Sequence, residues 1–290
     1  MKNPIQSSKI KGIKIIYNDP LEMIEYFDDE KNIRNGFCVK IWKDGRKFKG
    51  YYLNNKINGW ANLIRFDFDL KGDFCNDILN GYGEFVDKEE NKIYKGYWIN
   101  GKLEGIGIEL GSDYEYYGCF INKIKNGYGK QIWSDNEVYE GLYKDDLFNG
   151  YGIYYFNENG KYYLGQWSNN EKNGYGELIT NNKIYMGFYL KDKKNGFGLS
   201  FSKKRKKFFL GFWKNGYKSG PFKEISENSI KYGIFDKEKN MNIIKDENNE
   251  FFQILEKEGL IKYKKFFRLS YEYISTLINN NEFNEILHHQ

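Results

Sequence analysis

The amino-acid sequence predicts a mainly β protein: an elongated single antiparallel sheet of consecutive β-hairpins, followed by amphipathic helices at the C-terminus. Three observations predict this fold. Phe, Tyr and Trp make up 19% of the 290 residues, whereas Ala61 is the only alanine, so the chain is rich in strand formers and poor in helix formers. Glycine recurs at a fixed period along most of the chain. Aromatic residues flank these glycines at a spacing of two, which is the period of a β-strand.

Two series of glycines define the repeat. Each glycine of the second series follows its partner in the first by nine residues, and successive repeats lie 22 to 24 residues apart. Such self-similarity is the signature of a repeat architecture, in which each unit packs against its neighbours. The first series is Gly50, Gly72, Gly96, Gly118, Gly141, Gly165, Gly187 and Gly211, and the second is Gly59, Gly81, Gly105, Gly127, Gly150, Gly174, Gly196 and Gly220.

Each repeat is predicted to form one β-hairpin. An aromatic residue stands two positions after every first-series glycine, and an aromatic residue or Leu70 stands two positions before it. The missing glycine side chain lets a ring approach the strand backbone. The second-series glycine usually follows Asn, and Asn-Gly predicts a turn or the entry to a strand. Eight such hairpins and partial ones form a meander of about 16 to 19 strands.

Three segments show the pattern most clearly: residues 94–107 (YKGYWINGKLEGIG), 139–152 (YEGLYKDDLFNGYG) and 163–176 (YLGQWSNNEKNGYG). They resemble MORN repeats, whose pattern is YxGxW, a short polar loop and GxG. The resemblance covers eight full repeats over residues 46–222, and degenerate repeats extend the predicted array to residues 26–244. It implies a curved sheet with a groove along one face. Departures from the pattern lie mainly at the ends, at Ala61, Leu70 and Pro221-Phe222.

Residues 1–25 are predicted to be an N-terminal extension that caps the array. KIKGIKIIY (9–17) alternates as a strand does. DPLE (19–22) carries a helix start, with a capping residue, a proline at the first helical position and a carboxylate three residues after the cap. We therefore expect a short helix there, in preference to a repeat strand over residues 24–30, as a cover for the first sheet edge.

After residue 245 the apolar period becomes helical, which predicts a helical tail over residues 245–290. One alternative is that the tail caps the last sheet edge or lies in the groove. A second is that it binds a partner or another copy of the chain. A third is a basic membrane helix, against which the acidic segment 246–258 argues. The apolar stripes are Phe251, Ile254 and Leu255, then Tyr263, Phe266, Phe267, Ile274, Leu277 and Ile278, then Phe283, Ile286 and Leu287.

A third apolar row lies on the opposite strand face, one residue after the second-series glycine. One interpretation is that this row completes the packing of the sheet itself. The other is that part of it lines the groove and receives a partner, because tyrosine combines apolar area, a hydrogen-bonding tip and little rotamer entropy. The predicted partner-binding residues are Tyr128, Tyr151 and Tyr175, which face the partner, together with Trp98, Trp167 and Trp213.

The residue types argue against catalysis. Histidine occurs only as His288 and His289, which excludes most histidine-based nucleophilic and metal chemistry. The three cysteines lie far apart, which favours a reducing, cytoplasmic compartment over a disulfide framework. The 45 basic and 40 acidic residues give a mixed surface that does not indicate nucleic acid binding. We expect no enzyme activity, no cofactor and no bound metal.

The sequence therefore predicts a noncatalytic scaffold that binds a peptide or helix of a partner protein along an aromatic groove. The MORN resemblance implies an assembly at the cytoskeleton, a cilium or the inner face of a membrane. One alternative is a peripheral membrane protein whose basic run binds anionic phospholipid (phosphoinositide) headgroups, although a solvated loop is the other interpretation of that run. Further alternatives are a regulatory subunit of an enzyme supplied in trans and a homodimer. The basic run is Lys203, Lys204, Arg205, Lys206 and Lys207.

Overall fold

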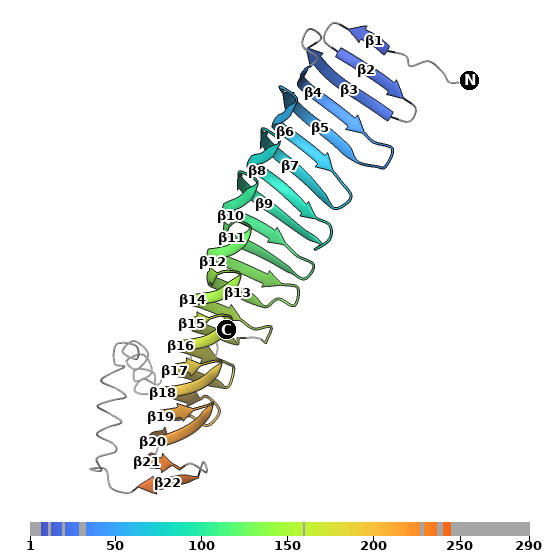
Figure 1. Cartoon of the computed structure of the whole chain (residues 1–290). Helices are drawn as coiled ribbons and strands as arrows, with labels where there is room; N and C mark the ends of the chain where they lie inside the picture. Colours follow the sequence, from blue (N-terminus) through green and yellow to red (C-terminus); the bar gives the residue numbers. More distant parts are fainter. Residues whose placement is uncertain are drawn as a thin grey trace, which may run out of the picture. The chain divides into compact units, whose positions relative to one another are not determined.

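The protein is mainly β, as the sequence predicts. The strands of the described residues, β1 to β22, belong to one open antiparallel sheet of hairpins, in which strands that follow each other in sequence pair, such as β4 with β5 and β5 with β6 (Figure 1). The helices predicted for residues 245–290 lie outside the described residues. The computed structural model describes residues 7–10, 13–18, 21–28, 33–158, 160–226, 229–236 and 240–244, with backbone alone for the first three of these ranges and for residue 244.

The described strands divide into two units, with the boundary between Phe148 and Asn149, inside β14 (Leu147–Tyr155). The first unit contains β1 (Ser7–Ile10), β2 (Ile13–Asn18), β3 (Leu21–Asp28), β4 (Ile33–Ile41), β5 (Lys47–Leu53), β6 (Lys56–Ile64), β7 (Phe68–Cys75), β8 (Ile78–Asp87), β9 (Lys92–Ile99), β10 (Lys102–Leu110), β11 (Tyr114–Ile121), β12 (Ile124–Trp133) and β13 (Val138–Lys144). The second contains β15 (Tyr162–Ser168), β16 (Glu171–Ile179), β17 (Lys183–Leu190), β18 (Lys193–Ser202), β19 (Lys207–Lys214), β20 (Tyr217–Ser226), β21 (Ser229–Phe235) and β22 (Met241–Ile244).

The helix expected from residue 19 is wrong, because Leu21–Asp28 form strand β3. β3 pairs with β2 on one side and with β4 on the other. Its register shifts between Glu25 and Phe27, as it does in the later hairpins. Two flanking strands satisfy the backbone groups of β3, and they outweigh a single helix cap. The strand expected over residues 9–17 is found as two strands, β1 and β2, which pair with each other.

The turn inside each of the eight full repeats uses two consecutive residues with positive φ. At Asn54 and Asn55, φ is 52° and 66°, the left-handed conformation that a two-residue type I′ turn requires. Asn, Asp and Gly tolerate this conformation best and occupy most of these positions. The other turns of this kind are Asn76–Asp77, Asn100–Gly101, Asn122–Lys123, Asp145–Asp146, Asn169–Asn170, Lys191–Asp192 and Asn215–Gly216.

The Asn-Gly pairs lie in strands, so of the two roles expected for them, a turn or the entry to a strand, the structure shows the second. Asn58 and Gly59 lie inside β6, whose pairing with β5 shifts in register between Gly50 and Tyr52. This β-bulge sets extra residues against the partner strand, and glycine takes the unusual backbone conformation there, with φ of 81° at Gly59. The bulge recurs in later hairpins. The Asn-Gly signal therefore marks the bulge, and the turn precedes it.

The core of each unit is a ladder of aromatic rings on one face of the sheet. In the second unit, Tyr163 is fully buried and its ring meets Trp167 edge-to-face, with centroids 5.1 Å apart. The Tyr163 hydroxyl donates a hydrogen bond to the carbonyl of Gln166 at 3.1 Å. The ring crosses the paired glycines Gly165 and Gly176, where an added Cβ would clash with it. The ladder therefore explains why the repeat needs both glycines.

Ala61 shows when a repeat tolerates a side chain at the second glycine position. Ala61 pairs with Gly50 across the hairpin and is completely buried. The ladder ring of this repeat belongs to Phe48, which lacks the hydroxyl that Tyr116 and Tyr163 extend over their glycines. The absence of that oxygen leaves room for one methyl group.

Candidate protein-binding face

Alternation along the strands gives the sheet two faces. The ladder face carries the rings and glycines described above, such as Tyr94, Gly96 and Trp98 in β9. The reverse face carries the residues between them, such as Tyr97 in β9 and Tyr82 in β8, which pair directly across the strands. A residue one position after a glycine of either series therefore contributes to a row of cross-strand pairs on the reverse face.

In the first unit, this row is open to solvent. Tyr82, Tyr97 and Tyr128 are 55%, 63% and 56% exposed, and Ile106 is 78% exposed. Tyr82 and Tyr97 meet edge-to-face, with ring centroids 5.5 Å apart. Large apolar side chains that stay this exposed on successive hairpins are typical of an interaction surface. We call the following residues the exposed row: Tyr51, Trp60, Tyr82, Tyr97, Ile106 and Tyr128.

Charged side chains flank the exposed row. The Lys95 ammonium lies 3.1 Å from the Glu84 carboxylate, and the Lys130 ammonium lies 3.9 Å from the Glu140 carboxylate. Both are ion pairs between neighbouring strands. The hydroxyl of Tyr128 donates a hydrogen bond to Glu140, and this bond raises the pKa of Tyr128 above its ordinary value. An apolar centre with a polar margin is the usual composition of a protein interface.

The three predicted tyrosines differ in burial. Tyr128 and Tyr151 are 56% and 55% exposed on the reverse face. Tyr175 occupies the equivalent place in its repeat but is only 9% exposed, and its ring meets Phe188. Tyr128 and Tyr151 therefore present their rings to solvent, whereas Tyr175 packs inside the protein.

The three predicted tryptophans are core residues of the ladder face. Trp98 and Trp167 are each 6% exposed, and Trp213 is 5% exposed. The indole N–H of Trp98 donates to the Gly83 carbonyl at 3.1 Å, and that of Trp167 donates to the Gly152 carbonyl at 3.3 Å. With covered rings, the tryptophans stabilise the sheet and offer a partner little surface. Their role in partner binding stays a prediction.

Sequence reasoning missed part of the exposed row. Tyr51 and Tyr97 follow a first-series glycine by one residue, and they pair with Phe37 and Tyr82 across the strands. The strand period already places such residues on the reverse face. The prediction considered this position only after the second-series glycine, so it found Tyr82 without its partner Tyr97 and missed both Phe37 and Tyr51.

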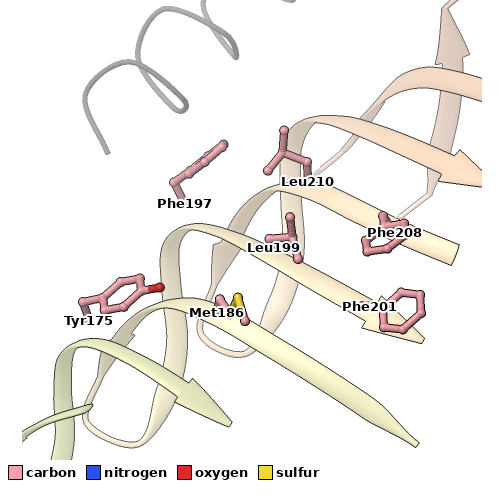
Figure 2. Close-up of a cluster of buried hydrophobic side chains, with 7 residues drawn as sticks. All are labelled: Tyr175, Met186, Phe197, Leu199, Phe201, Phe208 and Leu210. Carbon is pink, nitrogen blue, oxygen red and sulfur yellow. The ribbon is translucent and has the colours of Figure 1, made fainter. Parts of the chain in front are cut away.

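In the second unit, the reverse face carries a buried apolar cluster, which Figure 2 shows. Phe197 pairs with Phe212, and Leu199 pairs with Leu210, so that their side chains share the reverse face. Seven side chains from β16 to β19 are 9% exposed or less. We call them the reverse-face cluster: Tyr175, Met186, Phe197, Leu199, Phe201, Phe208 and Leu210.

The basic run forms the turn between β18 and β19. Lys204, Arg205 and Lys206 are exposed. Lys207 begins β19, and its ammonium lies 3.0 Å from Glu224. One of the five charges is therefore neutralised within the protein, and three are open to an anion. Lipid binding by this run stays a prediction.

Lysine replaces an apolar residue of the ladder face in several repeats. Leu79 and Leu103 stand seven residues after their first-series glycine, and Lys125 and Lys194 occupy the equivalent places in later repeats. Lys125 is 7% exposed, and its ammonium lies 3.4 Å from Glu109, which is 4% exposed. Burial lowers the pKa of Lys125, and the Glu109 carboxylate partly opposes this effect.

Lys194 has cationic neighbours instead of a carboxylate. Its ammonium lies 4.0 Å from the centroid of the Tyr185 ring. Burial, reinforced by the positive charges of Lys183 and Lys218, lowers the pKa of Lys194 to about 8. The ladder face of the second unit therefore holds a lysine whose charge is disfavoured by its surroundings.

Within the part of the chain that the structure describes, no three His, Cys, Asp or Glu side chains are placed to hold a metal ion. Among these residues there is also no helix with the length and apolarity needed to cross a membrane.

Two solved structures show a weak similarity to the chain. The TCP10 domain of Danio rerio CPAP covers 73% of this chain and 99% of its own, at 8% identity and a TM-score of 0.30. The TCP domain of Drosophila melanogaster SAS-4 (dCPAP), in complex with a proline-rich motif of Ana2 (dSTIL), covers 85% and 96%, at 13% identity and a TM-score of 0.17. Such TM-scores do not establish a shared fold. No curated protein matches the chain.

The MORN repeat model matches five stretches of the sequence. From residue 94 onward, each matched stretch contains a ring, a glycine, a second ring and a GxG, the elements whose packing forms the ladder face. The matched stretches are residues 30–45, 94–115, 116–138, 139–161 and 163–183. These five stretches of the chain are MORN repeats.

Proposed function

We propose that the protein is a noncatalytic scaffold that binds an α-helix of a partner protein through the exposed row of the first unit. The observation that carries the proposal is the exposure of Tyr82, Tyr97, Ile106 and Tyr128, which ranges from 55% to 78%. Aromatic residues are enriched in interfaces because they bring large contact area at little entropic cost. Repeat arrays use extended surfaces of this kind to bind partners.

The spacing of the exposed row matches that of residues along a helix. Equivalent side chains on successive hairpins are two strands apart, which is about 9.6 Å at about 4.8 Å per strand. An α-helix rises about 10.5 Å over seven residues. A helix lying across the strands therefore presents one residue of each heptad to each hairpin. We expect the partner helix to carry apolar residues at this period.

The chemistry of the face favours a helix over an extended peptide, the other form of partner expected from the sequence. The backbone groups of the paired strands bond within the sheet, so the reverse face offers a partner only side chains. An extended peptide on this face would leave many of its N–H and C=O groups without protein partners. A helix satisfies these groups internally.

The proposal is tested with a displayed library of helical peptides that carry apolar residues at heptad spacing. Replacing Tyr82, Tyr97 and Tyr128 together with Ser is expected to weaken binding of the selected peptides by about 100-fold or more, because each of the three contacts contributes about 1 kcal/mol or more. Unchanged binding by the triple-Ser protein, with an unchanged circular dichroism spectrum, would refute the assignment.

The matched control replaces Leu53, Ile99 and Ile121 with Ser. These side chains are 54%, 57% and 55% exposed, but they stand next to the hairpin turns and outside the exposed row. The control removes a similar apolar area, so we expect it to change peptide affinity less than threefold. An equal loss in both triple variants would mean that binding follows general surface hydrophobicity and does not depend on the row.

A second candidate function is binding of anionic phospholipid headgroups. The exposure of Lys204, Arg205 and Lys206 in one turn supports it. Liposomes that contain a phosphoinositide should pellet the protein, and replacing these three residues with Glu should abolish pelleting. Equal pelleting by neutral liposomes would contradict this candidate.

The cellular setting is also part of the proposal. The MORN resemblance supports a cytoplasmic scaffold in an assembly at the cytoskeleton, a cilium or a membrane, and any enzyme activity of that assembly is supplied in trans. Proximity labelling in the source cell checks this setting. Labelled partners from an unrelated compartment would contradict it.

A further inference from the structure

The reverse face changes its chemistry along the chain. Glu84, Lys95, Lys130 and Glu140 stand beside the exposed row in the first unit and keep that face polar at its margins. The equivalent positions on β17, β18 and β19 hold three apolar residues instead. These residues are Met186, Leu199 and Leu210, which pair or lie beside one another across the strands.

Burial changes together with the chemistry. Phe197 and Tyr128 occupy equivalent places in their repeats, yet Phe197 is 1% exposed and Tyr128 is 56% exposed. Leu199 and Leu210 are each 6% exposed. Glu177 lies at the border of the reverse-face cluster, and burial raises the pKa of its carboxyl group. The side chains of the reverse-face cluster are therefore shielded from water, unlike Tyr128 in the first unit.

The described strands do not account for this shielding. All of them belong to one sheet, and the cluster residues project from a single face of it. Rings and glycines bury each other on the ladder face, but the reverse face of the first unit has the same strand pairing and leaves Tyr82, Tyr97 and Tyr128 open to solvent. A cluster of this size on an uncovered face would be an unusually large apolar patch.

We propose that residues 245–290 of the same chain fold back over the reverse-face cluster and form the second layer. The strand β22 ends at Ile244, and β21 and β20 connect it through direct pairing to β19, which carries Phe208 and Leu210. The chain continues for 46 residues beyond that point. The tail therefore begins within a few strands of the surface that it covers.

The size and pattern of the tail fit the cluster. The distance from β16 to β20 is about 19 Å at about 4.8 Å per strand. Residues 263–278 would span about 24 Å as an α-helix, at about 1.5 Å per residue. In the sequence, Phe266, Phe267 and Ile274 fall on one side of a helical pattern, and Lys265 and Arg268 fall on the other. One such helix spans the cluster with one face.

This inference divides the reverse face into two functional parts. The exposed row of the first unit stays available to a partner. The reverse-face cluster of the second unit is occupied by the tail, which keeps the cluster from associating with other chains. Of the alternatives open for the tail, the inference selects a contact within the chain and places it on the reverse face.

Photo-crosslinking of the full chain tests the inference. A benzoylphenylalanine is placed at Phe197 in one protein and at Tyr128 in a matched control, because these positions are equivalent in the repeat. We expect the probe at 197 to crosslink within a monomer to peptides from residues 245–290, at least tenfold more than the probe at 128. Crosslinks from 197 to a second chain, or the absence of crosslinks to the tail, would overturn the inference.

A second measurement does not depend on the probe. Replacing Phe266 and Phe267 with Asp in the full chain is expected to speed amide hydrogen exchange in β18 and β19 by at least tenfold and to increase binding of a dye specific for exposed apolar surface. Replacing Lys265 and Arg268 with Asp, on the opposite side of the same helix, is expected to change neither. Equal effects of the two pairs, or no effect of the first, would contradict the tail contact.

Discussion

Replacing Lys194 with Leu is expected to stabilise the second unit at neutral pH. The Lys194 ammonium is partly buried, lies against the ring of Tyr185, and has Lys183 and Lys218 as its charged neighbours. The equivalent residue in an earlier repeat is Leu103, which is completely buried on the ladder face. Leucine therefore fits this position and removes a charge that the surroundings disfavour.

The expected gain follows from the pKa of Lys194. A fall in pKa from 10.5 to about 8 means that the charged form costs about 3 kcal/mol in the folded protein, because each tenfold change in an equilibrium constant is worth about 1.4 kcal/mol. The ammonium keeps some contact with water, and its contact with the Tyr185 ring offsets about 0.5 to 2 kcal/mol. We expect Lys194→Leu to raise the free energy of unfolding by about 1 to 2 kcal/mol at pH 7.

The pH dependence gives a sharper test than the gain itself. The pKa of Lys194 is lower in the folded than in the unfolded chain, so between about pH 8 and 10.5 the unfolded chain binds more protons. The stability of the wild-type protein therefore rises with pH through this interval as far as this residue is concerned. The Leu variant lacks this rise, so its advantage at pH 7 is expected to shrink by about 1 kcal/mol at pH 9.5.

Urea unfolding of both proteins at pH 7 and at pH 9.5 measures the difference. Lys172→Leu is the matched control, because Lys172 occupies the equivalent position but lies 3.4 Å from the Asp192 carboxylate. Its removal breaks an attraction, and we expect no stabilisation. The reasoning is refuted if Lys194→Leu leaves stability at pH 7 unchanged or lowers it, or if its advantage is the same at both pH values.

Three further predictions concern the ladder face. Gly176→Ala should lower the free energy of unfolding by about 2 to 3 kcal/mol, because the added Cβ meets the ring of Tyr163. In urea unfolding, Tyr163→Phe in the same chain should recover part of this loss. Fully additive effects of the two substitutions on stability would contradict the clash. Lys125→Met should lower the free energy of unfolding by about 2 to 4 kcal/mol, because the buried Glu109 carboxylate then loses the cation that lies beside it. Adding Glu109→Leu to the same chain should restore most of this stability. If it restores none, the ion pair is not the cause of the loss. Burial raises the pKa of Tyr163 above its ordinary value of 10. The stability that the buried neutral phenol contributes is therefore complete below pH 10 and is lost as the pH rises above it. The midpoint of thermal unfolding should fall from pH 9 to 11, and a constant midpoint would contradict the burial of the ladder tyrosines.

The repeat and its ladder could be predicted from the sequence because both depend on short-range spacing. Tyr163, Gly165 and Trp167 lie on one face through the period of the strand alone, and Gly176 meets them through a hairpin. The sequence left open whether Asn-Gly marks a turn or the entry to a strand, because the pair is compatible with both a type I′ turn and a β-bulge. Only the register of β5 with β6 shows that Gly59 belongs to the bulge.

The N-terminal helix could not be judged from local signals. The cap pattern at residues 19–22 is a favourable helix start by itself. Pairing of β3 with β2 and β4 gives this segment more hydrogen bonds than a short helix provides. Such pairing involves residues up to about 17 positions away, such as Met23 with Lys40, and no local pattern contains that information.

The candidate site was only partly predictable. The sequence placed Tyr128, Tyr151 and Tyr175 at equivalent positions, and it offered no reason to treat them differently. The structure leaves the first two exposed and buries Tyr175 at 9% exposure, in contact with Phe188. Burial depends on what lies above a strand face, and the strand period reports only which face a residue takes.

The sequence by itself determined the MORN repeats, the pairing of each ring with a glycine, and the alternation that gives every strand a ladder face and a reverse face. These features depend on steric rules that act over two to nine residues. The tertiary structure alone decided which apolar residues of the reverse face stay exposed and which are buried, and which lysines have a carboxylate neighbour. Burial and electrostatic environment are sums over all groups near a side chain, and folding brings most of those groups from distant parts of the chain.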